Sequence, residues 1–153
     1  TTTLGKIKNH DQLNDNESSH VMTRFIPGSE YTIHVYSTQD GRMSSILPLL
    51  VISKTGSTNY AVVDYPPGIE NFIFDLHSHF EMSGVYNVQA KFFKNKWFVF
   101  EINPRLASTG ALGFLLGLDP LEVLTNQRSV DLSSHEGLVV TRRTSTSLSS
   151  VLS

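Results

Sequence analysis

The sequence predicts an α+β fold, with a mostly antiparallel sheet and helices packed on one face of it. Short β-rich runs separated by turn signals, one helical stripe in the middle of the chain and a hairpin after it lead to this prediction. The 153 residues fit a single compact domain, and 39% apolar residues are enough to build a core.

The first elements are two β-rich runs, residues 20–26 and 31–38, which the turn signal at residues 27–30 separates. A second turn signal, Gln39-Asp40-Gly41-Arg42, predicts a hairpin, and residues 43–52 form its largely apolar return strand. The polar residues 54–59, which include Gly56, are expected to form a loop.

A helix is predicted next, between the Pro66-Pro67 pair and Gly84. Its apolar stripe has helical spacing and comprises Ile69, Phe72, Ile73, Leu76 and Phe80. His77 and His79 lie two positions apart, about 200° around the helix, so they do not face one metal together. We expect both to be histidines of the helix surface and flank.

Two strands around a short polar turn, residues 86–93 and 97–103, form the most informative segment. With the turn centred on Asn95, Gln89 lies opposite Glu101, and Trp97 lies near the turn. One face is then apolar and packs against the helix through Val88, Ala90, Phe92, Phe98, Phe100 and Ile102. The other face carries Asn87, Gln89, Lys91, Glu101, Asn103 and, one step past Pro104, Arg105; its single carboxylate is Glu101.

This polar face has the ligands for a hard cation. Oxygens from a carboxylate and carboxamides suit Mg²⁺, which keeps several waters and shares phosphate oxygens. The Arg105 guanidinium supplies fixed donors that fit a phosphate. Spacing alone equally allows an amphipathic hairpin whose polar face is simply hydrated.

The residues of this hairpin also resemble a known family. Glu101-Ile102-Asn103-Pro104-Arg105 resembles the E-[IM]-N-P-R signature of ATP-grasp ligases, and the strand at residues 87–89 resembles the carbamoyl-phosphate-synthetase large-subunit-like branch. The resemblance extends over roughly residues 1–125 and includes residues 25–32, the loop at 54–58 and the helices near 67–83 and 106–118. At position 34 the family often has Asp, where this chain has His34.

The resemblance implies the C-terminal part of an ATP-grasp fold, with ATP and Mg²⁺ (or Mn²⁺) as cofactors. Gln89, Glu101 and Asn103 would be metal ligands, and Asn103, Arg105 and Lys54 would bind the nucleotide, with Arg105 also catalytic. A solvated loop lysine is an equally open interpretation of Lys54. The implied reaction activates a carboxylate as an acylphosphate, which an amine or similar nucleophile then attacks.

The organisation implied is that of a partial domain. Residues 1–128 would be the C-terminal part of the ATP-grasp domain, and residues 129–153 a polar, partly disordered C-terminal extension. The chain begins without Met, as if cut inside a larger fold, so the N-terminal ATP-grasp half is expected in cis or in trans. The alternative is a non-catalytic, degenerate module that binds a nucleotide or a protein partner, so whether the chain is an enzyme stays open.

Composition limits the remaining partners. With 12 Lys+Arg against 14 Asp+Glu and no basic block, the chain does not read as a nucleic-acid binder. The absence of cysteine excludes disulfides and thiolate chemistry. No apolar run approaches the roughly 20 residues of a membrane span, and no signal peptide is recognisable, so we expect no membrane partner and a cytoplasmic location. The expected partners are therefore a nucleotide, a carboxylate substrate and an amine-type acceptor.

Overall fold

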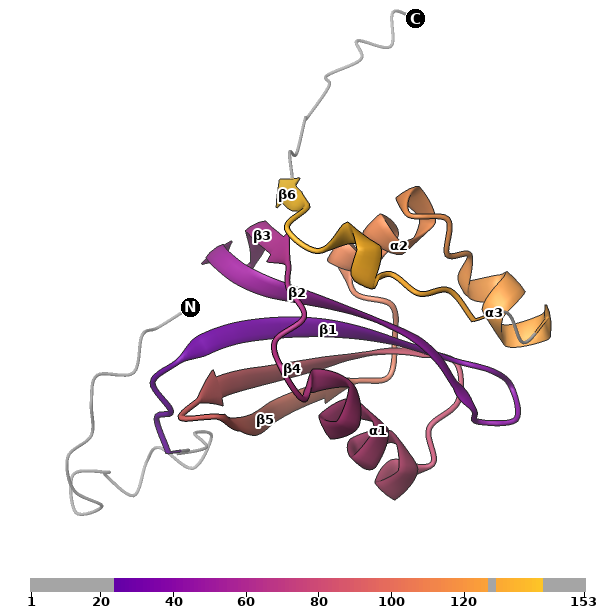
Figure 1. The fold of residues 1–153 in the computed structure, drawn as a ribbon, viewed down its shortest axis with the longest axis horizontal. Coiled ribbons are helices and arrows are strands. Elements are labelled where there is room, and N and C mark those ends of the chain that lie inside the picture. Colours follow the sequence, from indigo (N-terminus) through magenta and orange to yellow (C-terminus); the bar gives the residue numbers. More distant parts are fainter. Residues whose placement is uncertain (1–23, 127–128, 142–153) are drawn as a thin grey trace, which may run out of the picture.

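The computed structural model describes residues 24–126 and 129–141, which form one six-stranded sheet (Figure 1). The strand order is β5-β4-β1-β2-β3-β6, and all neighbouring strands are antiparallel. The strands are β1 (Ser29–Ser37), β2 (Met43–Thr55), β3 (Ser57–Val63), β4 (Val85–Phe93), β5 (Lys96–Asn103) and β6 (Val139–Thr141). The predicted α+β class with a mostly antiparallel sheet is confirmed.

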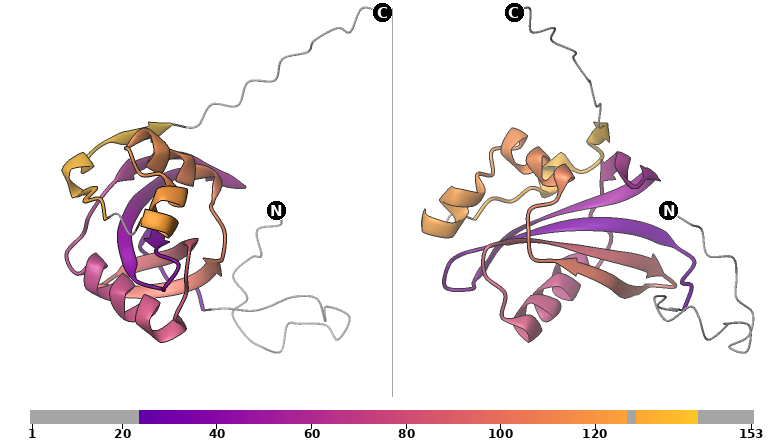
Figure 2. Two further views of the ribbon diagram at one scale, coloured as in Figure 1. Left: turned by 90° about the vertical axis from the view of Figure 1, so that its right-hand side faces the viewer. Right: turned by 180° about the vertical axis from the view of Figure 1, so that it is seen from behind.

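The helices lie on both sides of a curved sheet, where one helix-covered face was expected. They are α1 (Ile69–Phe80), the short turns η2 (Ser108–Gly110) and η3 (Ser133–His135), α2 (Ala111–Leu115) and α3 (Pro120–Asn126). Helix α1 packs on the convex side, and α2 and α3 lie on the concave side (Figures 1 and 2). The reason is that β1 is buried on both faces: Ile33 joins the α1 core, whereas Tyr36 packs with Leu118 and Val123.

The first hairpin forms where the sequence predicts it. Strands β1 and β2 pair across the predicted turn, although β2 continues to Thr55. The prediction of a loop over residues 54–59 is wrong, because Gly56 (φ 71°) makes a tight turn and β3 begins at Ser57. Of the run predicted over residues 20–26, residues 20–23 lie outside the described part, and residues 24–26 form no strand.

Helix α1 has the predicted apolar stripe except in its last turn. Ile69 and Ile73 are buried, and Phe72 and Leu76 pack at the margin of the same core. Phe80 is exposed, and the buried side chain of the last turn is His77, contrary to expectation, while His79 is exposed. The His77 ring is satisfied at both nitrogens, by the Tyr86 hydroxyl (2.8 Å) and the Gly41 carbonyl (2.7 Å), which is why a polar ring is tolerated there.

The β4–β5 register is confirmed where the candidate site lies. Gln89 pairs with Glu101. A bulge next to Gln89 then shifts the register by one residue, so Ala90 pairs with Val99 rather than with Phe100. The prediction that Phe98 and Phe100 line the core is therefore wrong: Trp97 takes that place, stacked on Phe72 with ring centroids 5.1 Å apart.

The helical segment after β5 is less continuous than expected. The helix predicted near residues 106–118 is divided into η2 and α2, and Gly117 (φ 81°) follows α2 in a left-handed conformation. Residues 129–141 pack on the same body, since Leu132 is buried and β6 pairs with β3. The division of the chain at residue 128 stays a prediction.

Candidate functional site

The polar end of the concave face is built from alternate residues of β1 and β4. Glu30, Thr32 and His34 of β1 pair with Lys91, Gln89 and Asn87 of β4, respectively. Because side chains alternate along a strand, all six point to the side opposite α1. Helices α2 and α3 lie over the core around Tyr36 on this face, and Glu30, Lys91 and Gln89 remain partly accessible.

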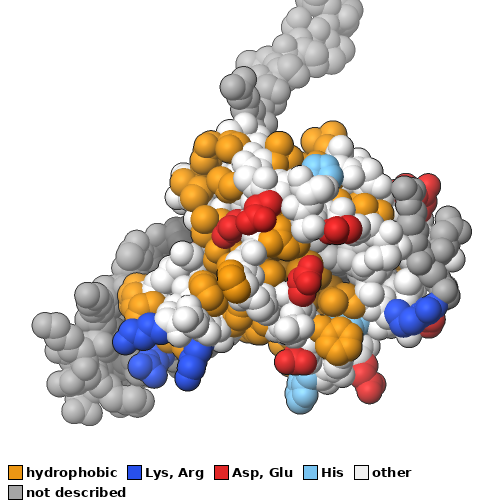
Figure 3. Space-filling model, viewed as in Figure 1, with side chains coloured by type: hydrophobic (Ala, Val, Ile, Leu, Met, Phe, Trp, Pro, Cys, Tyr) orange, Lys and Arg blue, Asp and Glu red, His pale blue; other side chains and the backbone are white. Residues whose placement is uncertain are grey.

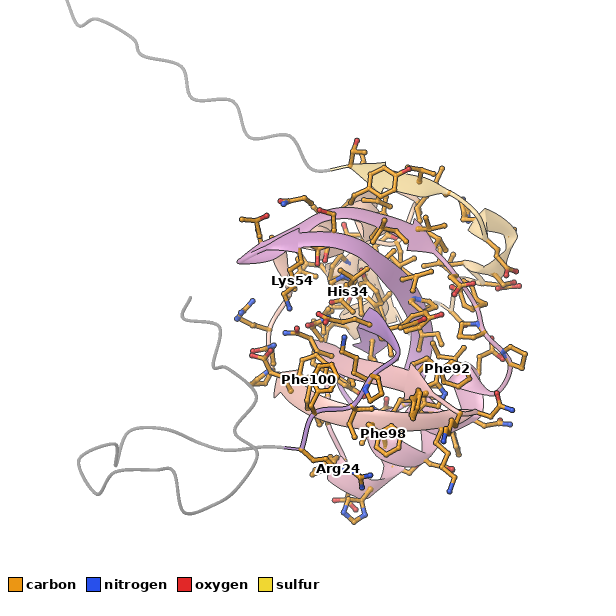
Figure 4. All side chains as sticks on the ribbon, turned by 90° about the vertical axis from the view of Figure 1, so that its left-hand side faces the viewer. Arg24, His34, Lys54, Phe92, Phe98 and Phe100 are labelled. Atoms are coloured by element: carbon orange, nitrogen blue, oxygen red, sulfur yellow. The ribbon has the colours of Figure 1, made fainter. Side chains whose placement is uncertain are left out.

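Strand β5 adds the acidic group. The Gln89 amide donates a hydrogen bond to the Glu101 carboxylate, as the antiparallel pairing of the two residues allows. The bulge leaves Phe100, the residue before Glu101, 52% exposed. In Figure 4, Phe100 lies on the same side of the sheet as Lys54 and His34, whereas Phe92 lies on the other side.

A lysine connects this pair to a second carboxylate. Lys54, near the end of β2, donates to the Glu30 carboxylate (2.9 Å) and to the Gln89 amide oxygen (3.2 Å). Lys91 pairs with the other Glu30 oxygen at 3.0 Å. Burial alone raises the pKa of Glu30, but the hydrogen bonds from Lys54 and Lys91 outweigh it and lower the pKa below its usual value.

Glu30 is therefore the residue that sequence reasoning missed. The expectation that Glu101 is the only carboxylate of this face is wrong, since Glu30 shares it. Two features of the sequence could have identified Glu30. It precedes Tyr31, which is buried, so the two side chains point to opposite faces of the strand, and it lies in the segment that resembles the family. In Figure 3 a group of Lys and Arg side chains lies at the end of the molecule where β1 begins, further basic side chains lie at the opposite end, and the Asp and Glu side chains of this view lie in the middle and toward that opposite end.

The remaining predicted residues lie on the continuation of β5. Asn103 pairs with Asn87, two residues beyond the Gln89–Glu101 pair on the same face. Arg105 follows in an exposed segment, with its backbone N–H donated to the Asn103 carbonyl (2.7 Å) and its guanidinium to the Leu106 carbonyl (3.4 Å). The structure thus joins Lys54, Gln89 and Glu101 by hydrogen bonds and sets Asn103 two residues farther along β5. Arg105 lies two residues past the end of this strand, with its guanidinium bonded to the Leu106 carbonyl.

His34 closes the inner end of the site. The ring is completely buried, and its Nε2 lies 2.9 Å from the Thr109 hydroxyl. Its Nδ1 has no hydrogen-bond partner among the described residues. Burial lowers the pKa of His34 to about 4, so the ring is neutral at neutral pH.

A metal ion would need more than acidic and imidazole groups here. In residues 24–126 and 129–141, no three His, Cys, Asp or Glu side chains converge as a metal cluster. The donor set is instead the Glu101 carboxylate with the carboxamide oxygens of Gln89 and Asn103, and the Lys54 ammonium group lies against the Gln89 oxygen. Oxygens of these two kinds are the ligands that a hard divalent cation takes.

The architecture and these residues define the chain as part of an ATP-grasp fold. A protein-family model described as "ATP-grasp in the biosynthetic pathway with Ter operon" matches residues 16–123. The chain belongs to this ATP-grasp family. No curated protein matches it.

Several solved structures are similar in fold. The phosphoribosylaminoimidazole carboxylase ATPase subunit from Aquifex aeolicus is 19% identical, with 59% of this chain and 29% of that chain covered and a TM-score of 0.49. The L-amino acid ligase from Bacillus licheniformis is 15% identical, with coverages of 74% and 32% and a TM-score of 0.47. N5-carboxyaminoimidazole synthetase from Staphylococcus aureus, complexed with ADP, is 15% identical, with coverages of 56% and 25% and a TM-score of 0.43. The match thus spans about a third or less of each of these proteins.

None of the helices in the described residues has both the length and the apolar character needed to cross a bilayer.

Proposed function

We propose that this chain supplies the metal and phosphate side of the ATP site of an ATP-grasp ligase. The observation that carries the proposal is the hydrogen-bonded chain Lys54–Gln89–Glu101 on the concave face of a family member. Following the resemblance of its signature, we assign the chain to the carbamoyl-phosphate-synthetase-like branch. We further propose a cytoplasmic ligase that converts a carboxylate into an acylphosphate for attack by an amine.

In this proposal the ligands of Mg²⁺ are Gln89, Glu101 and Asn103. The Gln89 amide now donates to Glu101 and accepts from Lys54, so it must turn about its last torsion to offer its oxygen to the metal. With its amide turned in this way, Gln89 would no longer accept from Lys54, whose ammonium group would then be available to a phosphate oxygen. When bound, Mg²⁺ neutralises the negative charge of the β- and γ-phosphates.

In this proposal the other residues of the concave face bind the nucleotide and orient its phosphates. Arg105 donates to phosphate oxygens and stabilises the charge that develops on the transferred phosphoryl group. Glu30 holds Lys54 and Lys91 near the phosphates through its two ion pairs. The exposed ring of Phe100, next to Glu101, offers an apolar surface for the nucleotide base.

The test is a calorimetric titration of the chain with ADP in the presence and absence of Mg²⁺. We expect weak, Mg²⁺-dependent binding that Glu101→Gln weakens by about tenfold or more, because a charge-assisted contact is worth about 1.5–3 kcal/mol. Glu70→Gln is the matched control, since Glu70 is an exposed carboxylate in the first turn of α1. Binding that survives both EDTA and Glu101→Gln would reject the assignment.

Turnover separates the ligase from the alternative, a non-catalytic ATP-grasp module. The alternative module would bind either a nucleotide or a protein partner, so nucleotide binding alone does not separate the two interpretations. Only the ligase, completed by the N-terminal half, should consume ATP when carboxylates and amines are supplied together. Binding without ATP consumption across a broad panel of amino acids and organic acids would favour the non-catalytic module.

A further inference from the structure

One residue on the concave face has a chemistry that the proposed function does not use. Along β1, Glu30 binds two lysines, Thr32 accepts a hydrogen bond from Asn87 (2.7 Å), and His34 comes next. His34 is thus the last polar side chain of the row before the apolar core under α2 and α3, where Tyr36 lies.

The contacts of His34 lead to a different part of the chain. Its Nε2 is bonded to the hydroxyl of Thr109, a residue of η2 that lies 75 positions away. Gly110 packs directly against the same ring, since a Cβ placed there would lie 3.2 Å from Nδ1 and 2.4 Å from a methyl group of Leu106. A glycine at this position therefore allows η2 to approach the sheet closely.

The segment held in this way carries the candidate phosphate ligand. Residues 104–108 leave β5 at the edge of the sheet and run across its concave side toward α2 (Figure 1). In Figure 4 the His34 side chain lies on this concave side, together with Lys54. Between Arg105 and Thr109 the segment is held at two points: the Gly110 N–H donates to the Ala107 carbonyl (2.8 Å), and the Leu106 side chain packs against Gly110. On the other side of Arg105, its N–H is bonded to the Asn103 carbonyl. A displacement at Thr109 is therefore transmitted over three intervening residues to Arg105.

We propose that His34 is a positioning residue that fixes the segment after β5 through Thr109 and so holds Arg105 beside Asn103. The inference rests on the proposed function, because Arg105 is assigned there to the phosphates. A neutral ring suits this task, since it makes the contact to Thr109 without placing a charge between the sheet and η2. The row on β1 therefore joins the cation-binding end of the site to the segment that carries its arginine.

The test removes the hydroxyl without changing the shape of its side chain. Thr109→Val deletes the hydrogen bond, and Thr109→Ser restores it. Thr125→Val on α3 is the matched control, because Thr125 is exposed and bonds only to Leu121 of its own helix among the described residues. His34→Gln probes the contact from the sheet side, because its amide donor reaches about as far as Nε2.

Two readouts are measured on the whole chain. The first is the exchange rate of the Arg105 amide, which should rise by about tenfold in Thr109→Val and stay unchanged in Thr109→Ser and Thr125→Val. The second is Mg²⁺-dependent ADP affinity in a double-mutant cycle with Arg105→Ala. If Thr109 acts through Arg105, Thr109→Val weakens binding by about tenfold in the wild-type background and by less than about twofold in Arg105→Ala.

Each outcome decides a separate statement. Unchanged amide exchange in Thr109→Val would overturn the positioning role, and so would additive effects in the cycle. A purely structural contact would lower the urea midpoint of unfolding and leave the affinity of the folded chain unchanged, which also overturns it. If the unaltered chain binds no Mg²⁺–ADP, the proposed function fails, whereas the exchange rates still decide whether His34 and Thr109 hold Arg105.

Discussion

Lowering the pH should destabilise the chain through His34. Its pKa falls from 6.5 to about 4 because the ring is buried, so the folded state binds fewer protons than the unfolded state between these values. The stabilising contribution is complete above about pH 6.5 and is lost as the pH falls toward 4. The structural cause is visible at Nδ1, which on protonation becomes a second donor with no acceptor among the described residues.

The magnitude follows from the difference between the two pKa values. A shift from 6.5 to about 4 corresponds to about 3 kcal/mol once both states are protonated. Between about pH 7 and pH 4.5 the loss is about 2.5 kcal/mol, because the folded ring is still mostly neutral at the lower pH. This is a large fraction of the 5–15 kcal/mol that roughly describes the stability of a domain.

The assay is urea unfolding at several pH values, followed by the fluorescence of Trp97, the single tryptophan, which is stacked on Phe72. The comparison protein is His34→Gln, which keeps a donor for Thr109 and does not titrate. The other histidines and the carboxylates titrate in both proteins, so their contributions cancel in the difference. We expect the wild-type advantage to shrink by about 2.5 kcal/mol from about pH 7 to 4.5. A difference that stays constant within about 0.5 kcal/mol would refute the burial argument.

Four further substitutions test the packing by urea titration. Ile73→Ala should cost about 3 kcal/mol because the side chain is fully buried, whereas Phe100→Ala should cost less than about 1 kcal/mol; equal costs would contradict the bulge. Gly28→Ala should cost at least about 2 kcal/mol, because φ is 141° and the new Cβ would lie 2.4 Å from a β4 carbonyl oxygen; a neutral effect would contradict that close approach. Tyr86→Phe should cost about 1–2 kcal/mol by leaving His77 Nδ1 without its partner, and an unchanged midpoint would argue against that bond.

The pair Gln89–Glu101 of the candidate site could be predicted from the sequence, although the turn was placed one residue off. A turn centred on Asn95 pairs Gln89 with Glu101, but in the structure Lys94 and Asn95 form a two-residue turn, and Phe93 pairs with Lys96. The bulge before Glu101 makes up the difference of one residue, so the predicted pair forms beyond it. The bulge at Phe100 could not be read in the same way. Residues 97–100 are all apolar, so a shift of one position leaves no break in the alternation of polar and apolar residues.

Other differences arise from tertiary contacts that local patterns do not contain. Residues 57–60 are polar, and they form a strand because β2 extends far enough to pair with them. His77 follows the stripe of α1 at helical spacing, and its burial depends on the Tyr86 hydroxyl and the Gly41 carbonyl, which come from other elements. Glu30 escaped notice for a similar reason, because its partners Lys54 and Lys91 come from two other strands.

The order of the side chains along β1 links the polar end of the concave face to the stability of the folded chain. Its alternate residues pass from ion pairs at Glu30, through hydrogen bonds at Thr32 and His34, to the buried ring of Tyr36. The same strand therefore contributes a carboxylate to the accessible end and apolar surface to the core under α2. A single neutral imidazole lies at the boundary, and it bonds to the segment after β5. Substitutions at His34 should thus affect folding and Arg105 together. Thr109→Val leaves the buried ring in place but removes the partner of its Nε2, so its effect on Arg105 is judged from amide exchange and ADP affinity rather than from the free energy of unfolding.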